Sequence, residues 1–149
     1  MQIRVDISTQ TLSLFDDCDA LVEAWPISTS QYGIGFEPGS YKTPLGRFLV
    51  SEKFGDNAPI GEIFVSRKPT GRIGIEGEEG DHVQTRILWL EGIDPENANT
   101  KSRYIYIHGT NWEQRIGTPA SHGCIRMRNQ DIIKLYDLVP IETLVVITK

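Results

Sequence analysis

The stretch Ile105-Tyr106-Ile107-His108-Gly109-Thr110, followed by Ser121-His122-Gly123-Cys124-Ile125-Arg126-Met127, holds the most concentrated chemistry in this chain. Apolar residues alternate before the histidine, which predicts a strand that ends there. The cysteine follows a loop and precedes a predicted helix, so the fold would bring a thiol and an imidazole together. A thiolate attacks in cysteine catalysis, and a neighbouring imidazole promotes its formation. The pattern favours Cys124 as a nucleophile with His108 as its partner.

Spacing alone leaves a second interpretation of Cys124 open, because an isolated cysteine is more often a buried structural thiol. The glycines of the two segments add to the catalytic interpretation. Gly109 and Gly123 would let the backbone approach a substrate closely. Backbone N–H groups around Gly123 and Cys124 would then be placed to stabilise an oxyanion.

Short apolar or alternating runs bounded by Gly, Pro, Asp and Asn recur along the chain, and they predict strands rather than helices. Only one segment has helical periodicity, with Asn129 as a candidate N-cap and Pro140 ending it. Two long connections, residues 28–45 and 69–84, are predicted to be loops. We therefore expect a mainly β (α+β) fold in a single domain over residues 1–149. The expected strands are 2–7, 11–15, 21–27, 46–51, 62–66, 85–90, 103–108 and 143–148, and the expected helix is 129–139.

Composition excludes several classes of function. The net charge is −5, which disfavours nonspecific attraction to nucleic acid or to anionic membranes. The two cysteines are too few for a disulfide framework. No stretch approaches the roughly 18 apolar residues of a membrane-spanning helix, and residues 1–6 lack the features of a secretory signal. We expect a cytoplasmic protein with a small-molecule partner, or a periplasmic one if an export signal was removed before Met1.

Charge is unevenly distributed in two neighbouring windows. Residues 76–96 contain seven acids and one arginine, which we interpret as solvated loop faces. Residues 101–128 contain five basic residues and one glutamate. This basic window includes Cys124, so it is a candidate for holding an anionic substrate.

Three segments together resemble a known family. Ser121-His122-Gly123-Cys124-Ile125-Arg126, the upstream Ile107-His108-Gly109 and the earlier Thr43-Pro44-Leu45-Gly46-Arg47-Phe48 resemble the L,D-transpeptidase catalytic domain, also called the YkuD domain. The resemblance runs from Ile3 to Ile147. It implies a β-sandwich or barrel with one helix near the C-terminus. It also implies a cysteine acyl transferase acting on peptidoglycan stem peptides or muropeptides, without cofactor or metal.

The resemblance also implies roles for individual residues. Cys124 would attack the bond between the L-centre of the third stem residue, usually diaminopimelate, and the terminal D-Ala. D-Ala leaves, and a thioester remains on Cys124. His108 would be the general base that later acts as an acid, and the carbonyl of Gly109 would orient its imidazole. His122 would shape the site and its oxyanion pocket, together with Ser121.

Substrate contacts are less constrained by the sequence. Arg126 would either pair with a substrate carboxylate or brace the cysteine loop, and both interpretations remain open. Tyr32 and Trp112 lie on loops expected to flank the groove, although aromatic residues more often serve packing. Among the remaining candidates, Cys18 is interpreted as an inert thiol and His82 as a surface histidine.

Several functions compete for the same residues. A zinc site would use His82, His108, His122 and Cys124, but their spacing matches no usual ligand motif. A noncatalytic module would bind wall fragments without turnover. Because no export signal is visible, the main hypothesis is an L,D-carboxypeptidase that trims tetrapeptides during wall recycling. The alternative is an L,D-transpeptidase that forms 3-to-3 crosslinks or attaches a lipoprotein. In either case, carbapenem-type β-lactams are expected to acylate Cys124.

Overall fold

The computed structural model describes residues 1–149 and contains ten strands, one α-helix and three short 3₁₀ segments. The α-helix is α1 (Asn129–Leu138), and the 3₁₀ segments are Pro95–Asn97, Lys101–Arg103 and Glu113–Arg115. The strands are β1 (Gln2–Asp6), β2 (Thr11–Phe15), β3 (Leu21–Ser28), β4 (Gly46–Phe54), β5 (Glu62–Val65), β6 (Lys68–Ile73), β7 (Val83–Gly92), β8 (Tyr106–Gly109), β9 (Ile125–Met127) and β10 (Leu144–Thr148).

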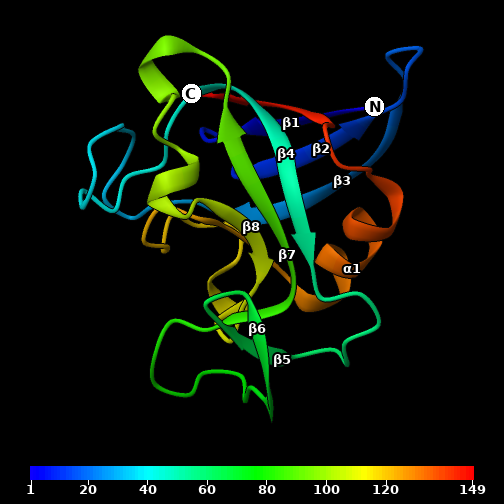
Figure 1. Cartoon of the computed structure of the whole chain (residues 1–149), viewed down its shortest axis with the longest axis vertical. Helices are drawn as coiled ribbons and strands as arrows, with labels where there is room; N and C mark the ends of the chain where they lie inside the picture. Colours follow the sequence, from blue (N-terminus) through cyan, green and yellow to red (C-terminus); the bar gives the residue numbers. More distant parts are fainter.

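Eight of the strands form a closed barrel. Neighbouring strands follow the order β4-β10-β1-β2-β3-β9-β8-β7, and a further pairing between β4 and β7 closes the ring. The pairs β1–β10 and β8–β9 are parallel, and the other pairs are antiparallel. The hairpin β5–β6 extends the sheet from β7 and lies at one end of the barrel (Figure 1). The expected mainly β fold is confirmed, and it is a mixed barrel.

Alternation of apolar residues explains why these strands form. In β1 the side chains of Ile3 and Val5 are buried, and in β2 those of Leu12 and Leu14 are buried. The antiparallel register pairs Ile3 with Leu14 and Val5 with Leu12, so both pairs face the same core. The main core contains twenty buried residues from the barrel strands, the neighbouring Ile105 and the helix region.

The helix begins at residue 129 as predicted and ends one residue earlier than predicted, but the N-cap is not Asn129. Arg128, with an extended backbone, occupies the N-cap position, and Asn129 is the first helical residue. Val139 is the C-cap, directly before Pro140, as a helix-terminating proline requires. The helix packs against β7 and β8. No helix in the structure is long and apolar enough to cross a membrane.

Two strands were missed by the sequence patterns. β6 lies inside the predicted loop 69–84, and every one of its residues is exposed, so it has no apolar alternation. β9 follows Cys124 directly. The cysteine therefore precedes a strand, whereas the prediction had it precede the helix. The predicted strand 103–108 begins only at Tyr106, because Lys101–Arg103 is a 3₁₀ turn and Tyr104 has a left-handed backbone with φ of 58°.

Candidate active site

Strands β8 and β9 bring the cysteine and histidine segments together. Their parallel register pairs Ile107 with Ile125 and His108 with Arg126. Both isoleucines are fully buried in the main core. Since side chains alternate along a strand, His108 and Arg126 lie on the opposite face. Cys124 precedes Ile125 by one position, so it shares this face with the histidine.

The Cys124 thiol lies against the backbone just before and at the start of β8. Its Sγ accepts the N–H of Tyr106 at 3.3 Å and faces the carbonyl oxygen of Tyr104 at 3.4 Å. Burial raises the pKa of the Cys124 thiol to about 12, and the Tyr106 N–H offsets only part of this effect. The thiol is therefore protonated at neutral pH, and its activation requires a base.

His108 has the properties of such a base. Its side chain is 2% exposed, and this burial lowers its pKa, although the charge of Asp81 and the Gly109 carbonyl counteract part of the shift. Nδ1 lies 2.5 Å from the carbonyl oxygen of Gly109. A carbonyl only accepts, so Nδ1 carries the proton and Nε2 holds the lone pair. His108 is a neutral imidazole with one nitrogen able to accept a proton.

Gly109 is packed too closely to accept a side chain. A Cβ built on it would lie 2.3 Å from Oδ1 of Asn129 and 2.8 Å from the carbonyl oxygen of Gln84. Asn129, predicted as a helix cap, instead donates to the carbonyl of Thr110 at 2.9 Å and accepts the Thr85 hydroxyl at 2.5 Å. The start of α1 thereby fixes the end of β8, where His108 is held.

Hydrogen bonds from buried hydroxyl groups fix the loop that carries Cys124. The Ser121 hydroxyl donates to the carbonyl of Cys124 at 2.7 Å and accepts the N–H of Gly123 at 3.3 Å. Thr43, from the loop of residues 28–45, donates its hydroxyl to the Gly123 carbonyl at 3.0 Å and accepts the N–H of Ser30 at 3.0 Å. Gly123 itself has φ of +118°, which other residues rarely adopt.

One backbone donor at the site is unused. The N–H of Cys124 donates no hydrogen bond within the protein. The N–H of Gly123, also predicted to serve an oxyanion, is already directed at Ser121. The Cys124 N–H is therefore the better placed of the two predicted donors for a developing negative charge.

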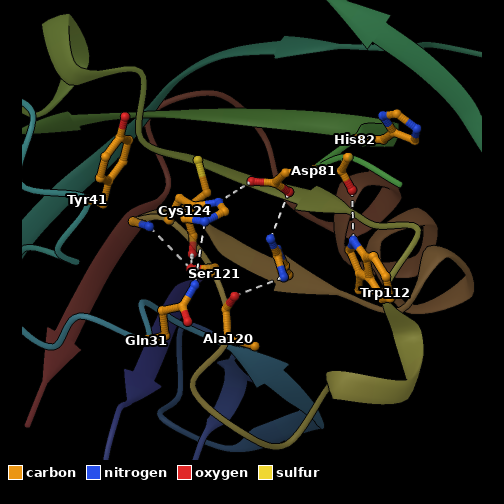
Figure 2. A network of polar contacts seen from close by, with 12 residues as sticks. Gln31, Tyr41, Asp81, His82, Trp112, Ala120, Ser121 and Cys124 are labelled. Carbon is orange, nitrogen blue, oxygen red and sulfur yellow. Dashed lines mark hydrogen bonds and ion pairs between the residues drawn. The ribbon is translucent and has the colours of Figure 1, made fainter. Parts of the chain in front are cut away.

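Asp81 is the site residue that the sequence did not indicate. Its carboxylate accepts Nδ1–H of His122 at 2.9 Å and pairs with the guanidinium of Arg126 at 2.8 Å (Figure 2). Partial burial would raise the pKa of Asp81, but the positive charges of Arg126 and of His108 when it is protonated, together with the His122 hydrogen bond, outweigh this effect, so the pKa is lowered. Asp81 is thus a carboxylate that hydrogen-bonds to His122 and acts electrostatically on His108.

Arg126 is buried and engaged within the protein. Its side chain is 2% exposed, and besides Asp81 it donates to the carbonyl of Ala120 at 3.2 Å (Figure 2). This position favours bracing of the cysteine loop over direct contact with a substrate carboxylate. A second arginine of the basic window holds the loop of residues 28–45. Arg103 donates to the carbonyls of Gly35 at 3.2 Å and Lys42 at 2.7 Å.

An aromatic wall borders the site on the side of residues 28–45. His122 stacks with Tyr32 at 6.0 Å between ring centroids and meets the edge of Tyr41 at 5.6 Å. Tyr32 and Tyr41 remain more than half exposed. Beside them lies a hollow of about 360 Å³, lined by Pro38, Gly39, Tyr41, Ser102, Arg103, Tyr104, Ile105 and His122. Tyr32 stacks on His122, which lines this hollow, and its role as a substrate contact stays a prediction.

Two other candidates lie beside Asp81. The indole N–H of Trp112 donates to the carbonyl of Gly80 at 2.7 Å and anchors the loop that carries Asp81 (Figure 2), and its role as a substrate contact stays a prediction. His82 pairs with Glu78 at 3.0 Å, and its side chain is 22% exposed. No three His, Cys, Asp or Glu side chains are arranged as a metal site. Cys18 is exposed and unpaired.

The acidic window was interpreted as solvated loop faces, which is wrong for three of its members. Asp81 belongs to the site, Glu78 pairs with Arg72 at 2.6 Å, and Asp94 pairs with Arg47 at 2.6 Å. These carboxylates hold loops in place around the barrel.

A mixed β-barrel with a neutral histidine on β8 and a cysteine directly before the neighbouring β9 has the arrangement of a cysteine-dependent enzyme. Comparison with known proteins specifies which one: residues 1–147 match the L,D-transpeptidase catalytic domain, YkuD. The chain belongs to this family. It is 36% identical over 104 residues to YqjB and 51% identical over 113 residues to YkuD, both of Bacillus subtilis (strain 168) and both named L,D-transpeptidases. These matches cover 67% and 74% of the chain, and 57% and 53% of the relatives, so the chain spans little more than half of their length.

Solved structures share the same fold. An L,D-transpeptidase from Mycobacterium smegmatis superposes with a TM-score of 0.65 at 19% identity, covering 99% of this chain and 58% of that one. The L,D-transpeptidase LdtMt1, solved in complex with imipenem, gives a TM-score of 0.62 at 19% identity, covering 99% and 58%. L,D-transpeptidase 3 from Mycobacterium tuberculosis, solved with a faropenem-derived adduct, gives 0.64 at 20% identity, covering 99% and 60%.

Proposed function

We propose that this chain catalyses cysteine-dependent acyl transfer on peptidoglycan stem tetrapeptides, as an L,D-transpeptidase. The observation that carries the proposal is the shared face of β8 and β9, with Cys124 and His108 on it. His108 has its Nδ1 proton committed to Gly109, and the backbone N–H of Cys124 is unused. These groups supply a nucleophile, a base and an oxyanion donor, which are the parts that acyl transfer requires.

In the acylation half, Nε2 of His108 takes the thiol proton as Sγ of Cys124 attacks the carbonyl carbon between diaminopimelate and D-Ala. The carbonyl oxygen becomes an oxyanion, which the N–H of Cys124 stabilises. The intermediate collapses by breaking the C–N bond, and His108 returns the proton to the departing amine. D-Ala leaves, and a thioester joins the peptide to Cys124.

In the second half, an amine of another stem peptide attacks the thioester carbonyl and gives its proton to His108. The tetrahedral intermediate expels the sulfur, which recovers this proton from His108. The products are a 3-to-3 crosslink and the free enzyme. Burial raises the pKa of the thiol to about 12 and lowers that of His108, which favours proton transfer during the attack over a preformed ion pair.

The acceptor separates this function from the L,D-carboxypeptidase hypothesis, in which water resolves the thioester. That hypothesis rested on a cytoplasmic location, which stays a prediction. The family and the named relatives favour the transpeptidase. A noncatalytic module would make no use of the acyl-transfer geometry, and a zinc site has no ligand set to support it.

Product analysis by mass spectrometry tests the proposal. The chain is incubated with a diaminopimelate-containing tetrapeptide, with and without a second stem peptide as amine acceptor. We expect D-Ala release, an acyl adduct on Cys124 and crosslinked dimers. Tripeptide as the dominant product in the presence of acceptor would instead establish the carboxypeptidase. Absence of both D-Ala release and adduct would reject acyl transfer altogether.

We also propose that carbapenem-type β-lactams acylate Cys124 through the same attack on a carbonyl. Imipenem should add one equivalent of its mass to the intact chain, and the adduct should be absent from Cys124→Ala. Cys18→Ser serves as the matched control because Cys18 is the exposed thiol. Loss of the adduct in Cys18→Ser but not in Cys124→Ala would contradict the assignment.

A further inference from the structure

A cationic side chain, Arg67, contacts the segment Tyr104–Tyr106 against which the Cys124 thiol lies. Arg67 lies in the two-residue turn of the hairpin β5–β6, between Val65 and Lys68, which pair with each other. Ser66 and Arg67 have φ of 49° and 66°, the left-handed values that such tight hairpin turns require. The backbone of this turn is therefore well defined, and it fixes the direction in which the Arg67 side chain leaves the hairpin.

Aromatic rings hold the Arg67 guanidinium in place. Its central carbon lies 4.6 Å from the ring centroid of Trp89 and 5.5 Å from that of Tyr104. Trp89 and Tyr104 stack at 5.8 Å between centroids. Nη1 of Arg67 donates to the hydroxyl of Tyr106 at 3.0 Å. A guanidinium resting on aromatic faces loses little further conformational freedom when it binds a ligand.

The Arg67 guanidinium has no carboxylate partner in the protein. The nearest acid that influences it, Glu52, is itself paired with Lys101 at 3.0 Å. An arginine has five N–H donors, and Arg67 forms one hydrogen bond within the protein, so its other donors are available to a ligand. Four other arginines form ion pairs, Arg4 with Asp19, Arg47 with Asp94, Arg72 with Glu78 and Arg126 with Asp81, whereas Arg86, Arg103, Arg115 and Arg128, like Arg67, form none.

Backbone contacts join this cluster to the nucleophile. The hydroxyl of Tyr106 accepts a hydrogen bond from Arg67, and the backbone N–H of Tyr106 donates to Sγ of Cys124 at 3.3 Å. Tyr104, which lies under the guanidinium, presents its carbonyl to the same sulfur at 3.4 Å. Cys124 also packs against the small core cluster that contains Tyr106. A single residue, Tyr106, therefore contacts both the guanidinium of Arg67 and the reacting sulfur.

We propose that Arg67 is a specificity-determining residue that binds a carboxylate of the substrate on the Trp89–Tyr104 side of Cys124. This inference rests on the proposed function. A stem tetrapeptide carries two carboxylates near the scissile bond, one on the leaving D-Ala and one on the diaminopimelate side chain. Arg binds either in a bidentate, charge-assisted pair, which lysine does not reproduce.

Steady-state kinetics on three peptides tests the proposal and separates the two carboxylates. The peptides are the diaminopimelate tetrapeptide, the same peptide ending in D-alaninamide, and a version with lysine in place of diaminopimelate. With the first peptide, Arg67→Gln should raise KM by roughly 10- to 100-fold and leave kcat nearly unchanged, because a charged hydrogen-bonded pair is lost from binding. The effect should vanish with the one peptide that lacks the recognised carboxylate.

Two further variants distinguish substrate recognition by Arg67 from a structural role of this residue. Lys68→Gln removes a neighbouring exposed charge from the same hairpin and should leave KM unchanged. Tyr106→Phe removes only the hydroxyl that Arg67 contacts, so a purely structural role predicts that it reproduces the Arg67→Gln defect. The proposal is overturned if it does, if Arg67→Gln has no effect, or if the defect persists equally with all three peptides.

Binding without turnover distinguishes this proposal from the proposed function. In a Cys124→Ala background, calorimetry measures the Kd of the diaminopimelate tetrapeptide with Arg67 and with Arg67→Gln. A weaker Kd in the Arg67→Gln protein supports carboxylate recognition, even if the wild-type chain fails to release D-Ala. Equal Kd values, or no binding by either protein, overturn it.

Discussion

At the scale of single residues, the site contains a protonated thiol and a neutral imidazole at rest. Burial moves both groups in the direction that removes charge: it raises the pKa of Cys124 to about 12 and lowers that of His108. A resting thiolate–imidazolium pair is therefore disfavoured. The thiol therefore depends on His108 for its reactivity. This dependence can be tested by the pH dependence of alkylation and of kcat/KM.

Alkylation of Cys124 by iodoacetamide should be slow at neutral pH and should rise steadily up to the highest pH at which the fold survives. The thiolate is the reacting species, and its fraction grows tenfold per pH unit below a pKa of about 12. The rate is measured by mass spectrometry in Cys18→Ser, which leaves one thiol. A rate that levels off at about pH 9 to 10 would show that the thiol has an ordinary pKa, and one that levels off at lower pH a lowered pKa; either result contradicts the raised pKa.

Asp81→Asn should shift the acid limb of the kcat/KM profile to lower pH. The limb reports protonation of His108, whose lowered pKa places it below the ordinary value of 6.5. The negative charge of Asp81 raises that pKa, so removing the charge lowers it further. The variant should also lose activity, because His122 and Arg126 lose their shared carboxylate.

The same variant should lower the free energy of unfolding, because it leaves the Arg126 charge buried without its counter-ion. We expect about 1–3 kcal/mol, less than for a fully buried pair, since the Asp81 side chain is 35% exposed. Glu79→Gln removes an exposed neighbouring acid and should change neither stability nor profile. If the acid limb of the kcat/KM profile does not shift in Asp81→Asn, the role of Asp81 is purely structural.

At the scale of elements, local patterns predicted the longer strands with one apolar face and missed one exposed strand and one very short strand. β1 and β2 have one apolar face each, and their bounds came within a residue of the prediction. β6 is exposed throughout, so it has no apolar alternation. β9 alternates Ile125, Arg126 and Met127, but three residues are too few to distinguish a strand from the surrounding loop.

The site shows the same division. Cys124 and His108 were found from residue type and motif, whereas Asp81 lies in an acidic loop that looks like many solvated loops. Its contacts with His122 and Arg126 depend on how residues 74–82 fold back over the barrel. Asn129 was predicted as a helix cap for its residue type, but tertiary contacts with Thr85 and Thr110 use its side chain instead.

The loop of residues 28–45 should control the cysteine loop through Thr43. Thr43→Val keeps the shape of the side chain but leaves the buried N–H of Ser30 and the carbonyl of Gly123 without a partner. We expect stability to fall by about 1–3 kcal/mol and kcat to fall because Cys124 is less firmly positioned. Urea unfolding and D-Ala release measure the two effects.

Thr11→Val is the matched control, since the Thr11 hydroxyl donates only to the carbonyl of Thr9 in an exposed turn. It should change stability by less than about 0.5 kcal/mol and leave kcat unaltered. If Thr43→Val loses stability but retains full kcat, the loop supports the fold without positioning the nucleophile.

At the scale of the whole molecule, the site is assembled from segments far apart in sequence. Residues 28–45, the Asp81 loop, β8 and the cysteine loop meet only because the β4–β7 pairing closes the barrel and the β8–β9 pairing joins its middle. The first and last strands, β1 and β10, are parallel neighbours, so the chain ends are also bound into the ring. The site cannot persist once this ring opens.

Unfolding of the barrel and exposure of Cys124 should therefore coincide. In Cys18→Ser, urea titrations followed by far-UV circular dichroism, tryptophan fluorescence and iodoacetamide labelling should give one shared midpoint, as expected for a single cooperative unit. The labelling rate should rise sharply at that midpoint, because unfolding removes the burial that raises the thiol pKa. Thr43→Val should move all three midpoints together. Labelling that rises at lower urea than the circular dichroism change would mean that the cysteine loop opens locally while the barrel remains folded.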